Sequence, residues 1–171
     1  MAKNLLISSS GLNVHAIEYR EAVVEIAKKY FYLSATNRLV IHIDDAMHYI
    51  KYTDIKSDII FSDLYNSQGM KPKQIKAPFL RDCKNTINQE GILVLNIRHT
   101  SPKLQEELDE LLAIEFDYRL LSFEVESGNR IALAFKNDIS LITKDELLTK
   151  GKWLQEEMNV PMERYAELHS F

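Results

Sequence analysis

The chain has 171 residues, 46% of them hydrophobic and 27% charged, with a formal net charge of −4. This is the balance of one globular domain, and an acidic chain whose lysines are scattered among acids argues against a nucleic-acid partner. No apolar run could cross a bilayer, and the single cysteine, Cys83, excludes an intramolecular disulfide, so we expect a cytoplasmic protein without membrane contact.

The first part of the chain alternates strand and helix patterns. Residues 13–18 alternate as a strand does and run into residues 20–31, whose apolar positions recur at helical spacing. Residues 38–43 are rich in β-branched side chains and predict the next strand, followed by a short helix over 46–51. Residues 57–62 contain an unbroken apolar run that is typical of a strand covered on both faces.

The alternation continues through the middle of the chain. A loop that carries Gly69 and Pro72 precedes a helix through Phe79 and Cys83. Gly91 then opens a strongly apolar segment, which predicts a buried strand.

The last part of the chain adds two helices, a hairpin and a final helix. Ser101 and Pro102 read as the N-cap and first residue of a helix. Residues 118–125 and 130–135 flank a turn at 127–129 and predict a hairpin. Thr143 and Glu146 match a capping box, which starts a further helix, and Pro161 begins a short final one.

Repeated alternation of strand and helix predicts an α/β fold. The expected architecture is a doubly wound, mainly parallel sheet with an antiparallel C-terminal hairpin. We assign residues 1–137 to this domain and 138–171 to its helical C-terminal extension. In such sheets, ligands bind beyond the carboxyl ends of the strands.

Acids follow three successive predicted strands. They are Glu18, Asp45 and Asp63. A carboxylate in this place can accept hydrogen bonds from ribose hydroxyls or from the exocyclic amine of adenine, or it can act as a base toward a reacting amine. Each could instead cap a helix or simply be solvated, and Asp44 could cap the helix at Ala46 in place of Asp45. The five histidines show no metal-ligand spacing, and no metal site is expected.

Four segments resemble motifs of the spermidine synthases, in the correct order. Residues 16–31 resemble the "VEID…VV…AKKYF" passage, and residues 43–46 resemble "GDA" with Asp44 in place of the glycine. Residues 57–63 are similar to "YDVIIVD", and residues 90–96 to the "GGILVxN" strand. The resemblance implies a Rossmann-like fold of the S-adenosylmethionine-dependent methyltransferase type.

The resemblance also implies a cofactor and site residues. S-adenosylmethionine or its decarboxylated form would bind through Glu18 on the ribose and through Asp44, Asp45 and Ala46 near the adenine. Asp63 would be the catalytic residue that orients the attacking amine and keeps it neutral. The implied reaction is transfer of an aminopropyl or methyl group to an amine.

Two departures from the family pattern stand beside this expectation. Where the family has a second aspartate that binds the polyamine, this chain has Asn66, preceded by Tyr65, which can supply an aromatic wall of a substrate site. An amide contributes no charge, so recognition of a dication should weaken. The glycine-rich turn after the first strand is also missing. The candidate strand at residues 5–8 is followed almost at once by the strand that begins at residue 13. A crossover between two parallel strands needs about a dozen residues, so the gap cannot hold the missing helix.

The incomplete first strand and helix lead to two hypotheses. The chain is either such a transferase domain or a truncated, non-catalytic relative that acts as an interaction or oligomerisation module. A missing strand would expose apolar side chains such as Ile17 and Ile43, so we expect a homodimer.

Overall fold

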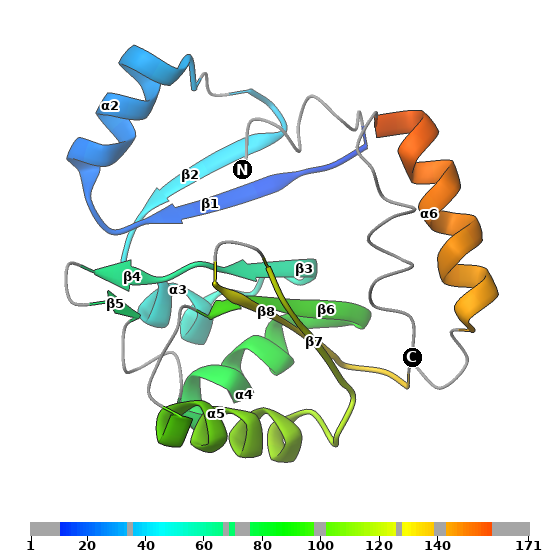
Figure 1. The fold of residues 1–171 in the computed structure, drawn as a ribbon. Coiled ribbons are helices and arrows are strands. Elements are labelled where there is room, and N and C mark those ends of the chain that lie inside the picture. Colours follow the sequence, from blue (N-terminus) through cyan, green and yellow to red (C-terminus); the bar gives the residue numbers. More distant parts are fainter. Residues whose placement is uncertain are drawn as a thin grey trace. The chain divides into compact units, whose positions relative to one another are not determined.

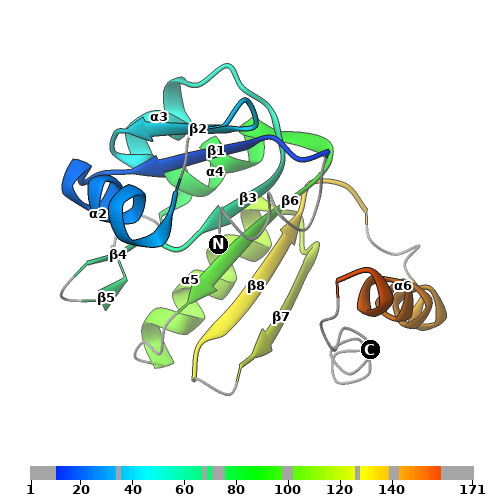
Figure 2. The same cartoon turned by 90° about the horizontal axis from the view of Figure 1, so that it is seen from above.

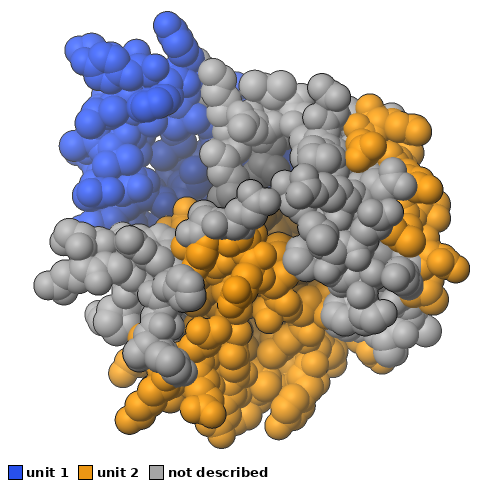
Figure 3. All heavy atoms as spheres, in the orientation of Figure 1, with its two compact units in different colours: residues 1–53 blue, residues 54–171 orange. Residues whose placement is uncertain are grey.

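The structure is a computed structural model with two compact units, residues 1–53 and 54–171 (Figure 3), here called the N-terminal and the C-terminal unit. Each is described by itself. The predicted domain boundary near residue 137 stays a prediction. The described residues are 11–33, 36–66, 69–70, 76–97, 102–125, 128–138 and 143–158.

The N-terminal unit contains two strand–helix pairs. Strand β1 (Val14–Glu18) leads into helix α2 (Glu21–Phe31), and β2 (Leu39–Ile43) leads into α3 (Ala46–Tyr52). The two strands pair in parallel from the first residue of each to the last (Figure 1), so their carboxyl ends lie side by side. The elements predicted for this part are confirmed, and four of their eight boundaries are shifted by one residue.

The C-terminal unit is built on a four-stranded sheet in the order β3-β6-β8-β7. Its strands are β3 (Ser57–Ser62), β6 (Ile87–Ile97), β7 (Leu120–Glu124) and β8 (Arg130–Phe135). Strands β3 and β6 are parallel, whereas β8 is antiparallel to both of its neighbours. The parallel pairing and the antiparallel hairpin are those that the sequence predicts.

The core of this unit lies on one face of the sheet, where helices α4 (Ala77–Thr86) and α5 (Pro102–Glu115) pack (Figures 1 and 2). Alternate residues of β6 are buried, with Leu93 completely so. Each such side chain contributes about 1.5–3 kcal/mol when fully buried. The helices contribute buried side chains of their own: Phe79, Leu80, Cys83, Leu108 and Leu112.

Strand β6 begins at Ile87, so the prediction that Gly91 opens the strand is wrong. Gly91 lies inside the strand, at a place where the surrounding atoms leave no room for a side chain. A Cβ atom at this position would lie 2.2 Å from Ile87 Cγ2 and 2.8 Å from the carbonyl oxygen of Asp58 on β3. Close approach to the neighbouring strand therefore requires a glycine.

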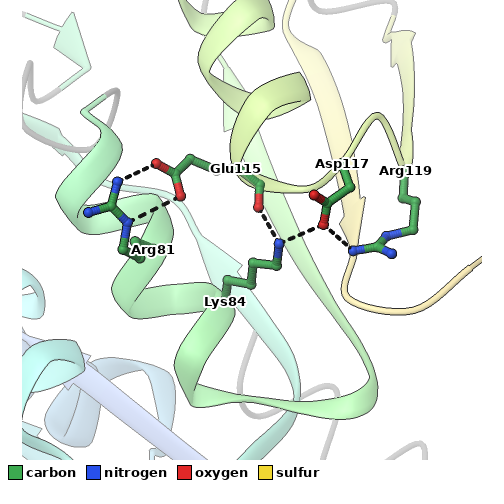
Figure 4. A network of polar contacts seen from close by, with 5 residues as sticks. All are labelled: Arg81, Lys84, Glu115, Asp117 and Arg119. Carbon is green, nitrogen blue, oxygen red and sulfur yellow. Dashed lines mark hydrogen bonds and ion pairs between the residues drawn. The ribbon is translucent and has the colours of Figure 1, made fainter.

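A polar network joins helix α4 to the end of α5 and the turn that follows it (Figure 4). Lys84 Nζ donates to the carbonyl oxygen of Glu115 at 2.5 Å and to the carboxylate of Asp117 at 2.8 Å. Arg81 pairs with the Glu115 carboxylate, and Arg119 pairs with Asp117. The hydrogen bond from Lys84 lowers the pKa of Asp117. The network therefore satisfies a carbonyl group at the end of α5 and fixes the turn into β7.

The remaining described elements are a short ladder and the last helix. The predicted loop around Gly69 contains β4 (Tyr65–Asn66) and β5 (Gly69–Met70), which pair antiparallel. Helix α6 (Lys144–Met158) begins with the predicted capping box, since Glu146 N donates to Thr143 Oγ1 at 3.2 Å and Thr143 N donates to Glu146 Oε2 at 2.9 Å.

Some predictions fall on residues outside the described part of the chain. These are the candidate strand at residues 5–8, the N-cap Ser101, part of the turn at 127–129 and the helix expected at Pro161. Within the described part, none of the helices is long and apolar enough to span a membrane.

Candidate functional site

The carboxyl ends of β1 and β2 bring two of the predicted acids close in the N-terminal unit. Glu18 is the last residue of β1, and Asp44 follows β2 directly, with its backbone nitrogen donating to the carbonyl oxygen of Glu18 at 3.2 Å. The Glu18 carboxylate accepts a hydrogen bond from the backbone nitrogen of Arg20 at 2.9 Å. The parallel register thus places Glu18 at the end of the sheet where a ligand is expected.

Asp44 and Asp45 divide their roles in a way that the sequence did not indicate. Asp45 is the N-cap of α3, because its Oδ1 accepts from Met47 N at 2.8 Å. The hypothesis that Asp44 caps this helix is therefore wrong. Asp44 instead binds His48 Nδ1 at 2.9 Å through Oδ2, and this bond is the main reason why the pKa of Asp44 is lowered. Ala46 is the first residue of the helix that Asp45 caps.

Two histidines stack on one side of the β1–β2 ladder. His15 Nδ1 lies 3.1 Å from His42 Nε2, the rings are 5.3 Å apart, and the Tyr49 hydroxyl of α3 lies 3.4 Å from His42 Nε2. Burial lowers the pKa of His42, and the neighbouring His15 lowers it further. Within the described ranges, no three or more His, Cys, Asp or Glu side chains gather as metal ligands. The histidine pair is a packing feature of this unit.

Asp63 follows β3 in the C-terminal unit and is held by β6. Its Oδ1 accepts from Asn96 Nδ2 at 2.9 Å. Ser62 pairs with Leu95 in the parallel register, so the next residue of each strand, Asp63 and Asn96, follows at the same end. Sequence reasoning missed Asn96 as a site residue, although its position in the apolar strand motif was a usable signal.

Tyr65 and Asn66 come two and three residues after Asp63. Their backbones form β4 and pair with Met70 and Gly69. Their side chains lie outside the described part of the structure, so the predicted aromatic wall and amide contact stay predictions.

The predicted site residues fall in two groups. Glu18, Asp44, Asp45 and Ala46 belong to the N-terminal unit. Asp63 belongs to the C-terminal unit together with its partner Asn96. Each group lies at the carboxyl end of a parallel strand pair, and each offers at least one carboxylate that can accept hydrogen bonds from hydroxyl or amine groups.

Comparison with known proteins identifies the family of the chain. The sequence model described as the spermine/spermidine synthase domain matches residues 8–115. The chain belongs to the spermine/spermidine synthase family.

Curated polyamine aminopropyltransferases align with most of the chain. A polyamine aminopropyltransferase of Vibrio vulnificus is 28% identical over 121 residues, which are 69% of this chain and 40% of that protein. A polyamine aminopropyltransferase of Neisseria meningitidis is 29% identical over 124 residues, which are 71% of this chain and 47% of that protein. The matched part of the chain therefore spans less than half the length of these relatives.

Solved structures show the fold of this family member. Human methyltransferase-like protein 13, solved in complex with SAH, matches with a TM-score of 0.85 at 20% identity, over 94% of this chain and 77% of that one. A spermidine synthase in complex with the transition state analogue AdoDATO matches with a TM-score of 0.73 at 14% identity, over 99% and 60%. The predicted Rossmann-like fold of the methyltransferase type is confirmed.

Proposed function

We propose that this chain is a transferase domain that binds S-adenosylmethionine or its decarboxylated form and transfers an aminopropyl or methyl group to an amine. Family membership and the place of Asp63 support this proposal. Asp63 follows a parallel strand at its carboxyl end, and Asn96 holds one of its carboxylate oxygens. This geometry is suited to a residue that orients an amine.

The proposed step is a displacement at a carbon bonded to the cofactor's sulfonium. The amine nitrogen forms a bond to that carbon, the carbon–sulfur bond breaks, and its electron pair stays on the sulfur as a neutral thioether. The proton that the nitrogen loses passes to the Asp63 carboxylate. The residue's task is orientation and proton acceptance, which contribute to rate through proximity and general base catalysis.

The N-terminal unit is proposed to bind the nucleoside. Glu18 would accept hydrogen bonds from the ribose hydroxyls, and Asp44, Asp45 and Ala46 would surround the adenine. Each carboxylate has about four acceptor sites, so the bond that Glu18 makes to the backbone of Arg20 leaves acceptor capacity for a ligand. Tyr65 and Asn66 are proposed to contact the amine.

Product analysis tests the proposal. The purified chain is incubated with each cofactor and a panel of mono- and diamines, and the products are identified by mass spectrometry. Methylthioadenosine reports aminopropyl transfer, and S-adenosylhomocysteine reports methyl transfer. We expect one of them to form in an amine-dependent way, and Asp63→Asn to abolish it. Asp58→Asn on the same strand is the matched control and should keep the activity.

One observation favours the alternative of a non-catalytic interaction module. The bonds of Glu18 to the Arg20 backbone and of Asp45 to the Met47 backbone give these acids local structural roles. Acids kept for such roles need no cofactor. A wild-type chain that forms neither product with any amine would favour this alternative.

We also propose that the chain forms a homodimer. Ile59 and Phe61 lie on one face of β3 with 48% and 41% of their surface exposed, and Ile43 at the end of β2 is 49% exposed. Ile17, also expected to be exposed, is partly buried. Apolar side chains on strands of an α/β sheet are normally covered, and a second copy would cover them. Light scattering should give a dimer mass at micromolar concentration, and a stable monomer would contradict the proposal.

A further inference from the structure

Three polar side chains form a continuous hydrogen-bonded chain across the C-terminal unit. Asn129 Nδ2 donates to Asn96 Oδ1 at 3.0 Å, and Asn96 Nδ2 donates to Asp63 Oδ1 at 2.9 Å. The three residues come from separate parts of the sheet: Asp63 follows β3, Asn96 lies near the end of β6, and Asn129 immediately precedes β8. Here they are called the asparagine relay.

The direction of the asparagine relay is fixed by its chemistry. An ionised carboxylate can only accept, so Asn96 must turn its amide nitrogen toward Asp63. Its oxygen is then left to face Asn129, which must donate. One orientation of each amide satisfies both bonds, and the opposite orientation of Asn96 would set an oxygen against the Asp63 carboxylate.

The backbone anchors the far end of the relay. Val125 N donates to the carbonyl oxygen of Asn129 at 2.8 Å, and Gly128 N donates to the carbonyl oxygen of Val125 at 2.8 Å. Gly128 has φ of 79°, a left-handed conformation that favours glycine. Two residues further, Ile131 pairs with Asn96 in the β6–β8 register. Asn129 is therefore held through its backbone just before β8, whereas Asp63 is an exposed residue that follows the end of its strand.

We propose that Asn129 is a positioning residue for Asp63 and acts through Asn96. By fixing the Asn96 amide, Asn129 keeps a donor on Asp63 Oδ1 and holds the carboxylate in one rotamer. The second oxygen, Oδ2, is then presented to the amine. This inference rests on the proposed function, in which Asp63 acts on the amine.

The sharpest perturbation is Asn129→Asp, which keeps the shape of the side chain and replaces its donor by an acceptor. Two oxygens then face each other at the Asn96 end, and rotating Asn96 would only move this repulsion to the Asp63 carboxylate. In either orientation the hold of the Asn96 amide on Asp63 is weakened. Asn129→Ala removes the donor without reversing the relay. Asn85→Asp makes the same change of charge at an exposed site on α4 and is the matched control.

The first readout needs no activity. In two-dimensional NMR of the full chain, we expect the side-chain amide signal of Asn96, assigned by its loss in Asn96→Ser, to move in Asn129→Asp and Asn129→Ala. Its exchange with solvent should become several-fold faster, because the amide loses the donor from Asn129 that fixes its orientation and holds less firmly to Asp63. The signal should stay in place in Asn85→Asp. An Asn96 signal that ignores both changes at position 129 would overturn the relay.

The second readout is catalytic. We expect Asn129→Asp to lower kcat about 10- to 100-fold, the cost of a misplaced reacting group, with little change in the cofactor's dissociation constant. Asn129→Ala should lie between Asn129→Asp and wild type. A moved Asn96 signal with unchanged kcat would overturn the positioning role. If the wild-type chain shows no turnover but the Asn96 signal still moves in the variants at position 129, the relay is established. The proposed function and the catalytic role of Asn129 are then both refuted.

Discussion

Replacing Gly91 by alanine tests the close approach of β3 and β6 in the C-terminal unit. The new Cβ would lie 2.2 Å from Ile87 Cγ2, 2.8 Å from the Asp58 carbonyl oxygen and 3.1 Å from the Asn88 carbonyl oxygen. Two of the three neighbours are backbone atoms, which cannot rotate away as the end of a side chain can. Ile87 is completely buried, so it has no open space to move into.

Two opposing effects set the size of the change. Alanine in place of glycine inside a strand gains about 0.5–1 kcal/mol from reduced chain entropy. Overpacking a filled core costs about 1–3 kcal/mol, and contacts this short belong at the upper end. We therefore expect Gly91→Ala to lower the free energy of unfolding by about 2 kcal/mol. For a chain of this length, that is a fall of about 4–8 °C in Tm.

Urea unfolding followed by circular dichroism measures this change. Gly11→Ala is the matched control, because a Cβ there meets nothing within 4 Å, and its effect should stay within about 0.5 kcal/mol. Adding Ile87→Leu removes the Cγ2 branch and should restore part of the loss in Gly91→Ala. Equal stability of the Gly91 and Gly11 variants would refute the close approach.

Three further changes test other parts of the structure. Lys84→Met removes the donor to the Glu115 carbonyl oxygen and should lower the free energy of unfolding, measured in urea, by about 1 kcal/mol. Burial and His15 lower the pKa of His42 in the folded chain below its ordinary value of 6.5. The neutral ring therefore stabilises the fold above pH 6.5, and this stability is lost as the pH falls through the lower pKa of the folded state. In His42→Asn, the urea midpoint should fall less steeply on acidification than in wild type. Asp45→Ala removes the N-cap of α3 and should lower the free energy of unfolding by about 1 kcal/mol. Asp45→Asn, which still caps the helix, should avoid most of this loss.

Each of these three predictions has a control variant or a result that would contradict it. Lys103→Met, at a largely exposed lysine of α5, should leave stability within about 0.5 kcal/mol of wild type. A pH dependence in His42→Asn as steep as in wild type would show that this histidine does not bind the proton in question. If Asp45→Asn is as unstable as Asp45→Ala, the cap is not the main role of the side chain.

The pattern of apolar residues was enough to locate the strands that carry the site. Strand β3 agrees with its predicted range at both ends, because polar residues bound its apolar run, and β8 agrees because a turn residue precedes it. The start of β6 was missed, since residues 88–90 are polar and read as a loop. The register between β3 and β6 is irregular at this place, between the pairs Ser57–Ile87 and Ile59–Ile92, and this irregularity is not visible in the sequence.

The acids at the strand ends were located, but their partners were not. Asp44 and Asp45 both fit a helix N-cap, and only the geometry decides which oxygen reaches Met47 N. Asn129 reads as a turn residue in the sequence. Its contact with Asn96 depends on the register of two strands that are far apart in the chain. Relations of this kind come from tertiary pairing.

Calorimetric titration of the purified chain tests the central claim most directly. The ligands are S-adenosylmethionine, its decarboxylated form and methylthioadenosine. We predict micromolar binding of at least one of them, its loss in Glu18→Ala, and its retention in Glu25→Ala, which removes the same charge from an exposed site on α2. Failure of all three ligands to bind would contradict the account and favour a non-catalytic member of the family.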